Sequence, residues 1–399
     1  MFVSMVVCVL IPRFQLTVAA GDREELMGTP AALAPEPGRE ARIGEVSLSA
    51  EAFGVRAGMP LGEALARCPT LALVPPDPAG VADAWERLLV RLESIGAAVE
   101  PERPGLASFA AQGLVRLHGG TLERLLAVTR TALRHPARIG AGPSRFCALA
   151  AATRARPRKP QIVVGDERAA RAYLASLPVA LLRGREETVA LPEALGRLGV
   201  ETLGELAKLP RAAVADRFGA PGLLAWELAH GRDGALRPRE VPERMEEELE
   251  LPEALSGAQL DRALGLLIDR LLARHERRGR TFRAVVLAAT LVEGGTWREQ
   301  VPFREALSDP TRMRLALASR LALLPAPAEK LRLAVVRFGP AASDQRSLLD
   351  EAAAERKARL REGVRQARAA AGPDAALRVL AVDPDSRVPE RRAVLTPFE

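Results

Sequence analysis

The chain has 399 residues, long enough for two to four domains, each with a buried core. Lys and Arg together number 57 and Asp and Glu 50, which gives a net charge of +7, and 48% of the residues are hydrophobic. This composition excludes a wholly disordered chain, a collagen-like chain and a disulfide scaffold. The positive balance is compatible with nucleic-acid binding, but GC-rich coding, which favours Arg over Lys, explains it equally well.

The cysteines and the N-terminus indicate where the protein works. Cys8, Cys68 and Cys147 are far apart and belong to no C-x-x-C pattern, so they predict neither a disulfide framework nor a zinc site. We therefore expect a reducing, cytoplasmic environment. The apolar run from Met1 to Ile11 is too short to span a bilayer and lacks the charged start and cleavage site of a signal peptide. It predicts a buried strand, and no membrane partner is expected.

Strand and helix patterns alternate over residues 1–165, which favours a sheet domain of the α+β or α/β type. Residues 20–47, rich in Gly, Pro and Glu, predict a loop or a small subdomain. The expected strands are 6–11, 71–74, 97–100, 107–117 and 137–141, and the expected helices are 60–67, 77–95 and 121–133.

The pattern changes twice further along the chain. Residues 166–236 predict a module of short helices alone, and a charged segment with two prolines predicts a linker at 237–247. Residues 248–341 then follow the β-α-β-β-α-β order of a split βαβ unit. The tail, 342–399, begins with an Ala- and Arg-rich helix at 348–371. The expected helices of the module are 167–176, 191–198, 203–209, 211–218 and 222–230; the split unit has strands at 248–251, 281–292, 296–304 and 330–338 and helices at 257–277 and 309–324.

Several local strings, in this order and spacing, resemble those of the Y-family (translesion) DNA polymerases. They are Phe53–Pro60 with Glu63 and Ala64, Arg138–Phe146, Arg158–Pro160, Leu177–Val179 and Leu195–Leu206. The resemblance implies an α+β multidomain fold shaped as a right hand. It consists of a palm at 1–165 with fingers inserted at about 12–70, a helical thumb with a helix-hairpin-helix, a split βαβ little finger, and a C-terminal helical tail.

The acids that the family uses for catalysis are missing from the expected positions. Polymerases of this kind hold two metal ions between carboxylates, one on the first strand and a pair on a later strand. Here neither Met5–Gln15 nor Gly105–Ala111 contains an acid, and the first acid of the chain is Asp22. Glu100 and Glu102 lie just before the second segment and could supply at most part of a site.

The nucleotide pocket departs from the family pattern as well. Glu51 stands where relatives present an Arg to the triphosphate, and Lys159 is the one vestigial nucleotide-binding residue. These departures predict no catalytic residues, no metal, no cofactor and no enzyme. The chain resembles the inactive Y-family accessory protein of the bacterial mutasome. That resemblance implies a scaffold in damage-induced mutagenesis, which bridges DNA, the sliding clamp, an error-prone replicative-type polymerase and a RecA-like protein.

The alternative is an active but divergent DNA-directed DNA polymerase, which would use Mg²⁺ and recruit Glu100 or Glu102 to it. Primer extension separates the two hypotheses. A third reading, a general binder of DNA structures outside repair, stays open beside them.

Candidate DNA contacts fall in the thumb and the little finger. Gly199 permits a tight turn and Thr202 caps the following helix, where exposed N–H groups can hold a phosphate, although an ordinary helix-to-helix turn has the same pattern. In the strand 296–304, period-two alternation places Trp297 and Phe303 on the packed face. The cations expected to track a phosphate backbone, or else to form a solvated surface, are Arg277, Arg278, Arg280, Arg283, Arg298 and Arg304.

A short string after the last expected strand resembles the bacterial clamp-binding peptide. Its residues are Gln345, Leu348 and Leu349, a polar anchor followed by two apolar side chains. The same leucines could instead begin the tail helix, with Ser347 as its cap.

Overall fold

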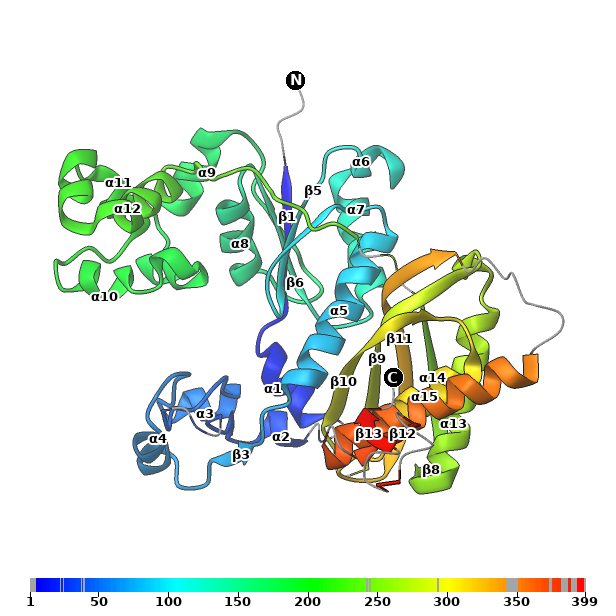
Figure 1. Cartoon of the computed structure of the whole chain (residues 1–399). Coiled ribbons are helices and arrows are strands. Elements are labelled where there is room, and N and C mark those ends of the chain that lie inside the picture. The colour runs from blue at the N-terminus through cyan, green and yellow to red at the C-terminus, as the bar shows by residue number, and fades with distance from the viewer. Residues whose placement is uncertain are drawn as a thin grey trace. The chain divides into compact units, whose positions relative to one another are not determined.

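A computed structural model describes residues 5–341 except 22, 24, 37, 39, 242, 244 and 293, and residues 351–397 except 373–374, 382–386 and 389–392. The chain divides into two compact units, Met1–Pro242 and Glu243–Glu399 (Figure 1). Each unit has its own hydrophobic core. The multidomain α+β fold expected from the sequence is confirmed.

A five-stranded sheet forms the centre of the first unit. Its strands run in the order β4-β5-β1-β6-β7, and the first strand of the chain, β1, lies in the middle with antiparallel neighbours on both sides. The apolar run at the N-terminus thus forms the buried strand that its composition predicts. The bounds are β1 Val6–Leu10, β4 Val99–Arg103, β5 Leu106–Ala110, β6 Arg138–Gly142 and β7 Gln161–Ile162.

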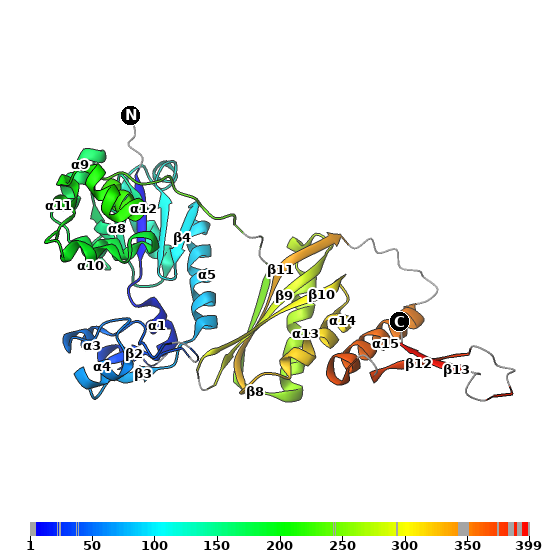
Figure 2. The ribbon, with the colours of Figure 1, turned by 60° about the vertical axis from the view of Figure 1, so that its left-hand side comes forward.

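Helices cover both faces of this sheet, and Figure 2 shows α5 and α8 on its two sides. Val7 and Val9 pack against α5 (Pro78–Ser94) and α7 (Leu122–Leu133) on one face. Cys8 packs on the opposite face with α8 (Arg145–Arg154), because successive strand residues point to opposite sides. Gly140 lets α8 approach closely, since a Cβ there would lie 2.2 Å from the backbone N of Ala152.

A small subdomain with its own core, the fingers, follows β1 (blue in Figure 1). The short parallel strands β2 (Ala31–Leu33) and β3 (Ala72–Val74) pair at its centre. Ser47 begins α3 by accepting a hydrogen bond from the N–H of Ala50. The helices are α1 Phe14–Ala20, α2 Glu25–Gly28, α3 Leu48–Ala52 and α4 Leu61–Arg67.

The helical module packs on the palm through α8, and the two share one core. Its last helix, α12, bends at Gly219, whose φ of 60° interrupts the helical backbone where a turn was expected. The module contains α9 Glu167–Leu174, the 3₁₀ turns Val179–Gly184 and Glu186–Thr188, α10 Leu191–Gly196, α11 Leu203–Lys208 and α12 Arg211–Ala229.

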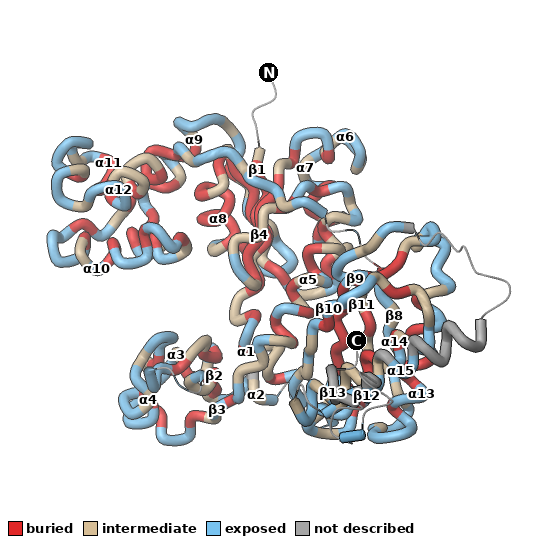
Figure 3. Tube along the Cα trace, in the orientation of Figure 1, coloured by how far each residue is buried: buried red, intermediate tan, exposed pale blue. Residues whose placement is uncertain are grey.

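The second unit is built on a four-stranded antiparallel sheet of order β10-β9-β11-β8. Strand β11 lies between β8 and β9, which is the split arrangement expected from the element order. Helices α13 and α14 pack on one face, and Figure 3 shows the buried strands beneath them. The bounds are β8 Glu246–Leu255, α13 Gly257–Ala273, β9 Arg280–Leu291, β10 Thr296–Leu307, α14 Pro310–Leu321 and β11 Ala328–Ala341.

The tail begins with α15 (Glu351–Ala371), and the Gln366 side chain donates to the carbonyl of Leu315 on α14. A hairpin of β12 (Leu377–Ala381) and β13 (Ala393–Pro397) follows it.

Several elements differ from the expectation. Leu114–Leu117 forms the helix α6 where a strand was expected, and helices α1 and α8 and strand β13 are among the elements that were not expected at all.

Within the described residues, no helix combines the length and the apolar character that crossing a membrane requires.

Candidate functional site

The two strands that the resemblance assigns to the metal ligands lie side by side at the centre of the palm sheet. Cys8 of β1 faces Ser108 of β5 in the antiparallel register, and both side chains are fully buried. Glu100 of β4 faces Ser108 from the other side. The two strands are therefore adjacent, as the resemblance implies, and they carry a thiol, a hydroxyl and apolar groups.

Gly105 sets the position of these strands. Its φ of +84° suits the turn between β4 and β5, and an added Cβ would lie 2.7 Å from the carbonyl of Ile11. The N–H of Ile11 donates to the carbonyl of Gly105 at 2.7 Å. This hydrogen bond holds the end of β1 next to the start of β5, and both lie in the segments where the acids were expected.

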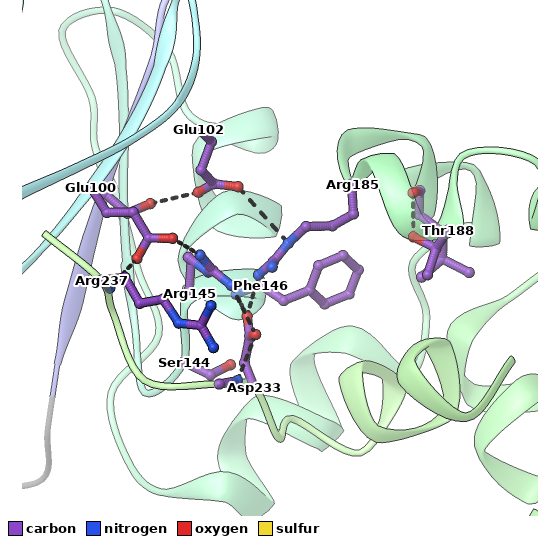
Figure 4. A network of polar contacts seen from close by, with 12 residues as sticks. Glu100, Glu102, Ser144, Arg145, Phe146, Arg185, Thr188, Asp233 and Arg237 are labelled. Carbon is purple, nitrogen blue, oxygen red and sulfur yellow. Dashed lines mark hydrogen bonds and ion pairs between the residues drawn. The ribbon is translucent and has the colours of Figure 1, made fainter. Parts of the chain in front are cut away.

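Glu100 and Glu102 point into a network of polar side chains (Figure 4). Glu100 forms an ion pair with Arg145 at the start of α8 and accepts the backbone N–H of Arg237 at 2.6 Å. Glu102 accepts the Ser108 hydroxyl at 3.1 Å and lies 3.9 Å from Nε of Arg185. Both carboxylates are therefore already partnered by protein groups.

Asp233, which follows α12, is the most buried acid of this network, with a side chain 2% exposed. It forms ion pairs with Arg145 and Arg185, whose side chains are 14% and 7% exposed. It also accepts the backbone N–H of Phe146 at 2.9 Å and that of Gly234 at 2.8 Å. The network thus joins the sheet and α8 to the 3₁₀ turns and the C-terminal end of the helical module.

The balance of charge and burial shifts two pKa values. Burial raises the pKa of Glu102, and the neighbouring Arg185 and Arg145 reduce that rise. Burial acts to lower the pKa of Arg145, but Asp233, Glu102 and Glu100 outweigh it and raise that pKa. The Nε atoms of Arg145 and Arg185 are buried and have no hydrogen-bond acceptor among the described residues.

The described residues do not fit the pair of metal ions that the family resemblance implies. No group of three or more His, Cys, Asp or Glu side chains among them could hold a metal ion. Glu100 and Glu102, the acids nearest the expected site, are engaged by guanidinium groups. A cation there would have to displace Arg145 and Arg185 from nearly buried positions.

The predicted nucleotide-pocket residues lie apart from this network. Lys159 is exposed and closes a turn with Arg156 through two backbone hydrogen bonds. Glu51 forms a 2.8 Å ion pair with Arg13, so its charge is partly neutralised. A contact between Lys159 and a nucleotide stays a prediction.

The thumb turn has the conformation expected for it, but its N–H groups already have acceptors. Gly199 has a φ of +73°, and Thr202 caps α11 by accepting the N–H of Glu205. The Glu205 carboxylate accepts the N–H groups of Glu201 and Thr202 at 2.8 and 2.9 Å. These donors are therefore engaged within the protein, and a DNA contact at this turn stays a prediction that must rest on other groups.

The predicted little-finger cations are only partly available. Arg280 forms a bidentate pair with Glu243 at 2.6 Å and lies 3.9 Å from the Phe338 ring centre. Arg298 and Arg304 are exposed on β10, while Val301 and Phe303 are buried, as the alternation predicts. Arg278 and Arg283 are also exposed, and Arg277 is half-buried.

The predicted clamp-binding residues, Gln345, Leu348 and Leu349, lie outside the described residues.

Three residues of the polar network, Arg145, Arg185 and Asp233, were not predicted from the sequence as site residues. Their partners lie 45 to 88 positions away along the chain. One signal was available: a lone Asp directly after a helix, in a segment otherwise rich in Arg.

Known proteins are similar to this chain over much of its length. Residues 9–153 match the model of the impB/mucB/samB family. A DNA polymerase IV of Dehalococcoides mccartyi (strain CBDB1) is 26% identical over 307 residues, covering 75% of this chain and 77% of that protein. A DNA polymerase IV of Pseudomonas putida (strain GB-1) is 27% identical over 344 residues, covering 80% and 95%. A solved Y-family DNA polymerase chimera has a TM-score of 0.48 at 15% identity, covering 84% of this chain and 99% of its own.

These matches correct one expectation. The prediction that the chain is not an enzyme is contradicted, because the relatives are named as DNA polymerases. One relative covers 80% of the chain, and the family match, residues 9–153, runs from the end of β1 through β5. Residues 9–153 are thus similar to the impB/mucB/samB family, and proteins named DNA polymerase IV are similar to three quarters or more of the chain.

Proposed function

We propose that this protein is a divergent translesion DNA polymerase, which binds primer–template DNA in the cytoplasm and extends primers slowly. The observation that carries the proposal is the family match over residues 9–153, from the end of β1 into α8, together with relatives named DNA polymerase IV that align over three quarters or more of the chain. DNA is the implied substrate, and deoxynucleoside triphosphates are the implied co-substrates.

DNA binding is supported by the charge distribution. Exposed cations lie on β9 and β10 of the second unit, among them Arg283, Arg298 and Arg304. Arg guanidinium groups bind phosphate oxygens without reading the base sequence, which suits a protein that acts on many template sequences.

Slow extension is expected because the central strands carry no acid. Mg²⁺, when bound by a polymerase, stabilises the charge that develops on the attacking and leaving oxygens. The described residues hold no group of ligands for it. What this chain supplies is a place for DNA beside the five-stranded palm sheet.

The same proposal includes protein partners. Gln345, Leu348 and Leu349 would bind a sliding clamp, as the resemblance of this string suggests. Contacts with an error-prone replicative-type polymerase and a RecA-like protein, in damage-induced mutagenesis, belong to the same proposal.

Primer extension with purified full-length protein tests the proposal. A labelled primer annealed to a longer template is incubated with the four deoxynucleoside triphosphates and either Mg²⁺ or Mn²⁺. We expect slow, template-directed extension. No extension above a blank without protein, from a preparation that still binds the same DNA, would contradict the polymerase proposal and leave DNA binding in place.

A further inference from the structure

One edge of the palm sheet carries a group of cations, and of these only Lys159 has a part in the proposed polymerase function, as the predicted nucleotide contact. We call it the edge cluster, and its side chains are all exposed. None of them forms an ion pair with a carboxylate of the described residues. The edge cluster consists of Arg130, Arg134, Arg154, Arg156, Arg158 and Lys159.

The topology gathers these residues around the edge strand β7. Arg130 and Arg134 end α7, which covers one face of the sheet, and Arg154 ends α8, which covers the other face. The turn that leads into β7, residues 156–159, lies at the edge between them. The cluster therefore extends from one face of the sheet around its edge to the other.

The backbone that carries the cluster is held in place. Arg156 and Lys159 exchange two backbone hydrogen bonds, of 3.1 and 3.0 Å. Arg130 donates from Nη1 to the carbonyl of Arg158 at 3.4 Å, which ties α7 to the turn. Pro157 restricts the turn further because its φ is fixed. Less conformational entropy is lost when a ligand binds side chains on such a fixed backbone.

Helix dipoles explain only part of this arrangement. Cations in the last turns of α7 and α8 interact favourably with the helix C-termini, which accounts for Arg130 and Arg154. Arg156, Arg158 and Lys159 lie beyond the end of α8 and have no such role. The first acids that follow are engaged elsewhere, since Asp166 caps α9 and Glu167 pairs with Arg232.

The cluster differs from most of the buried or half-buried arginines of the same unit. Arg145, Arg185 and Arg239 are each held by two carboxylates. The edge cluster concentrates positive charge on a surface that spans two faces, and no carboxylate of the described residues pairs with it. Such a surface fits an extended polyanion, and Arg is the residue best suited to bind phosphate oxygens in pairs.

We propose that the edge cluster is a second contact surface for the phosphate backbone of DNA, separate from the thumb and the little finger. This inference rests on the proposed function, because it assumes that the protein acts on DNA. It adds that the DNA, or its single-stranded template overhang, reaches the outer edge of the palm. Since the contacts are to phosphates, they contribute affinity and salt dependence and no base preference.

The test is the salt dependence of DNA affinity, measured by fluorescence anisotropy with a labelled primer–template that has a single-stranded overhang. The double variant Arg156→Ala/Arg158→Ala is compared with wild type and with Arg262→Ala/Arg270→Ala. The control removes two exposed arginines from α13 in the second unit, so both variants have the same net charge. Circular dichroism and thermal melting verify that each variant is folded.

We expect the edge variant to bind more weakly. Its log–log salt slope should become shallower by about 1.8 on duplex DNA, because each phosphate that a cation neutralises adds roughly 0.9 to the slope and two such cations are removed. The control should keep the wild-type slope. If the edge variant and the control behave alike while wild type binds DNA, the inference is overturned and the proposed function stands. If wild type binds no DNA at low salt, both are overturned.

Discussion

Asp233 brings together groups that are distant in the sequence. Its carboxylate pairs with two arginines and accepts two backbone N–H groups, one of them from the first turn of α8. A negative charge at that position also interacts favourably with the helix dipole. Without Asp233, Arg145 and Arg185 would each keep one carboxylate partner, Glu100 or Glu102, and would be less well neutralised in a low-dielectric environment. Asp233 therefore stabilises the packing of the helical module on the palm.

Asp233→Asn should lower the free energy of unfolding by about 3 kcal/mol, because the variant keeps the shape of the side chain and removes the carboxylate that Arg145 and Arg185 share. Chemical denaturation measures the change. Asp216→Asn, on the exposed surface of α12, is the matched control and should leave stability nearly unchanged. Equal stability of the two variants would show that the network does not hold the module in place.

Glu102 makes stability depend on pH in an unusual direction. Its pKa is raised above the ordinary value of 4.5, first by burial, so the folded state holds the proton more tightly than the unfolded state. Its contribution to stability is therefore present at low pH and is lost as pH rises from about 4.5 through the folded pKa. The lowered pKa values of exposed acids such as Glu40 and Glu243 act in the opposite direction.

The variant Glu102→Gln isolates this contribution. Relative to Glu102→Gln, wild type should lose stability as pH rises from about 4.5, since only wild type acquires the buried charge. Melting temperatures of both proteins across a pH series measure the difference. A wild-type protein that gains stability relative to the variant over the same range would mean that the arginines outweigh burial.

A local capping motif stabilises the start of helix α11 and engages N–H groups of the thumb turn. Thr202 and Glu205 form a capping box, in which each satisfies a backbone donor of the other. Thr202→Ala should destabilise the protein by about 1 kcal/mol, whereas Thr202→Ser should retain most of the cap. Thermal melting of the two variants tests this, and an Ala variant as stable as the Ser variant would contradict it.

Element by element, the sequence predicts those parts of the fold whose signals are local. Val6–Leu10 is apolar throughout and forms the central strand, and the caps Asp77 and Thr121 mark the starts of α5 and α7. Helix α8 was missed because it is buried over most of its surface, so no amphipathic period marks it. Strand β13 was missed because its partner β12 lies across a segment rich in Pro and Arg.

At the scale of the whole molecule, the positive charge is divided between two uses. Some arginines, such as Arg145, Arg185 and Arg239, hold the first unit together by pairing with acids of distant segments. Others, such as Arg156 and Arg158, are exposed and form no ion pair with a described acid. Composition cannot separate these uses, because the pairing depends on contacts across up to 153 residues of sequence.

Of the candidate site, the sequence alone predicts only the missing acids. The absence of acids from β1 and β5 follows from the sequence alone. The engagement of Glu100 and Glu102 by Arg145 and Arg185 does not, because it requires the three-dimensional approach of α8 and the 3₁₀ turns to β4. The hypothesis that these glutamates serve as metal ligands is therefore disfavoured by their observed partners.

Primer extension by wild type and by Glu100→Gln/Glu102→Gln side by side, on DNA that both are shown to bind, tests the proposed polymerase function most directly. We predict slow, template-directed extension by wild type and the same rate from the folded variant, because both glutamates form ion pairs with arginines. Absence of extension by wild type would contradict the polymerase assignment. Extension by wild type that the folded variant does not show would mean that the two glutamates act in catalysis.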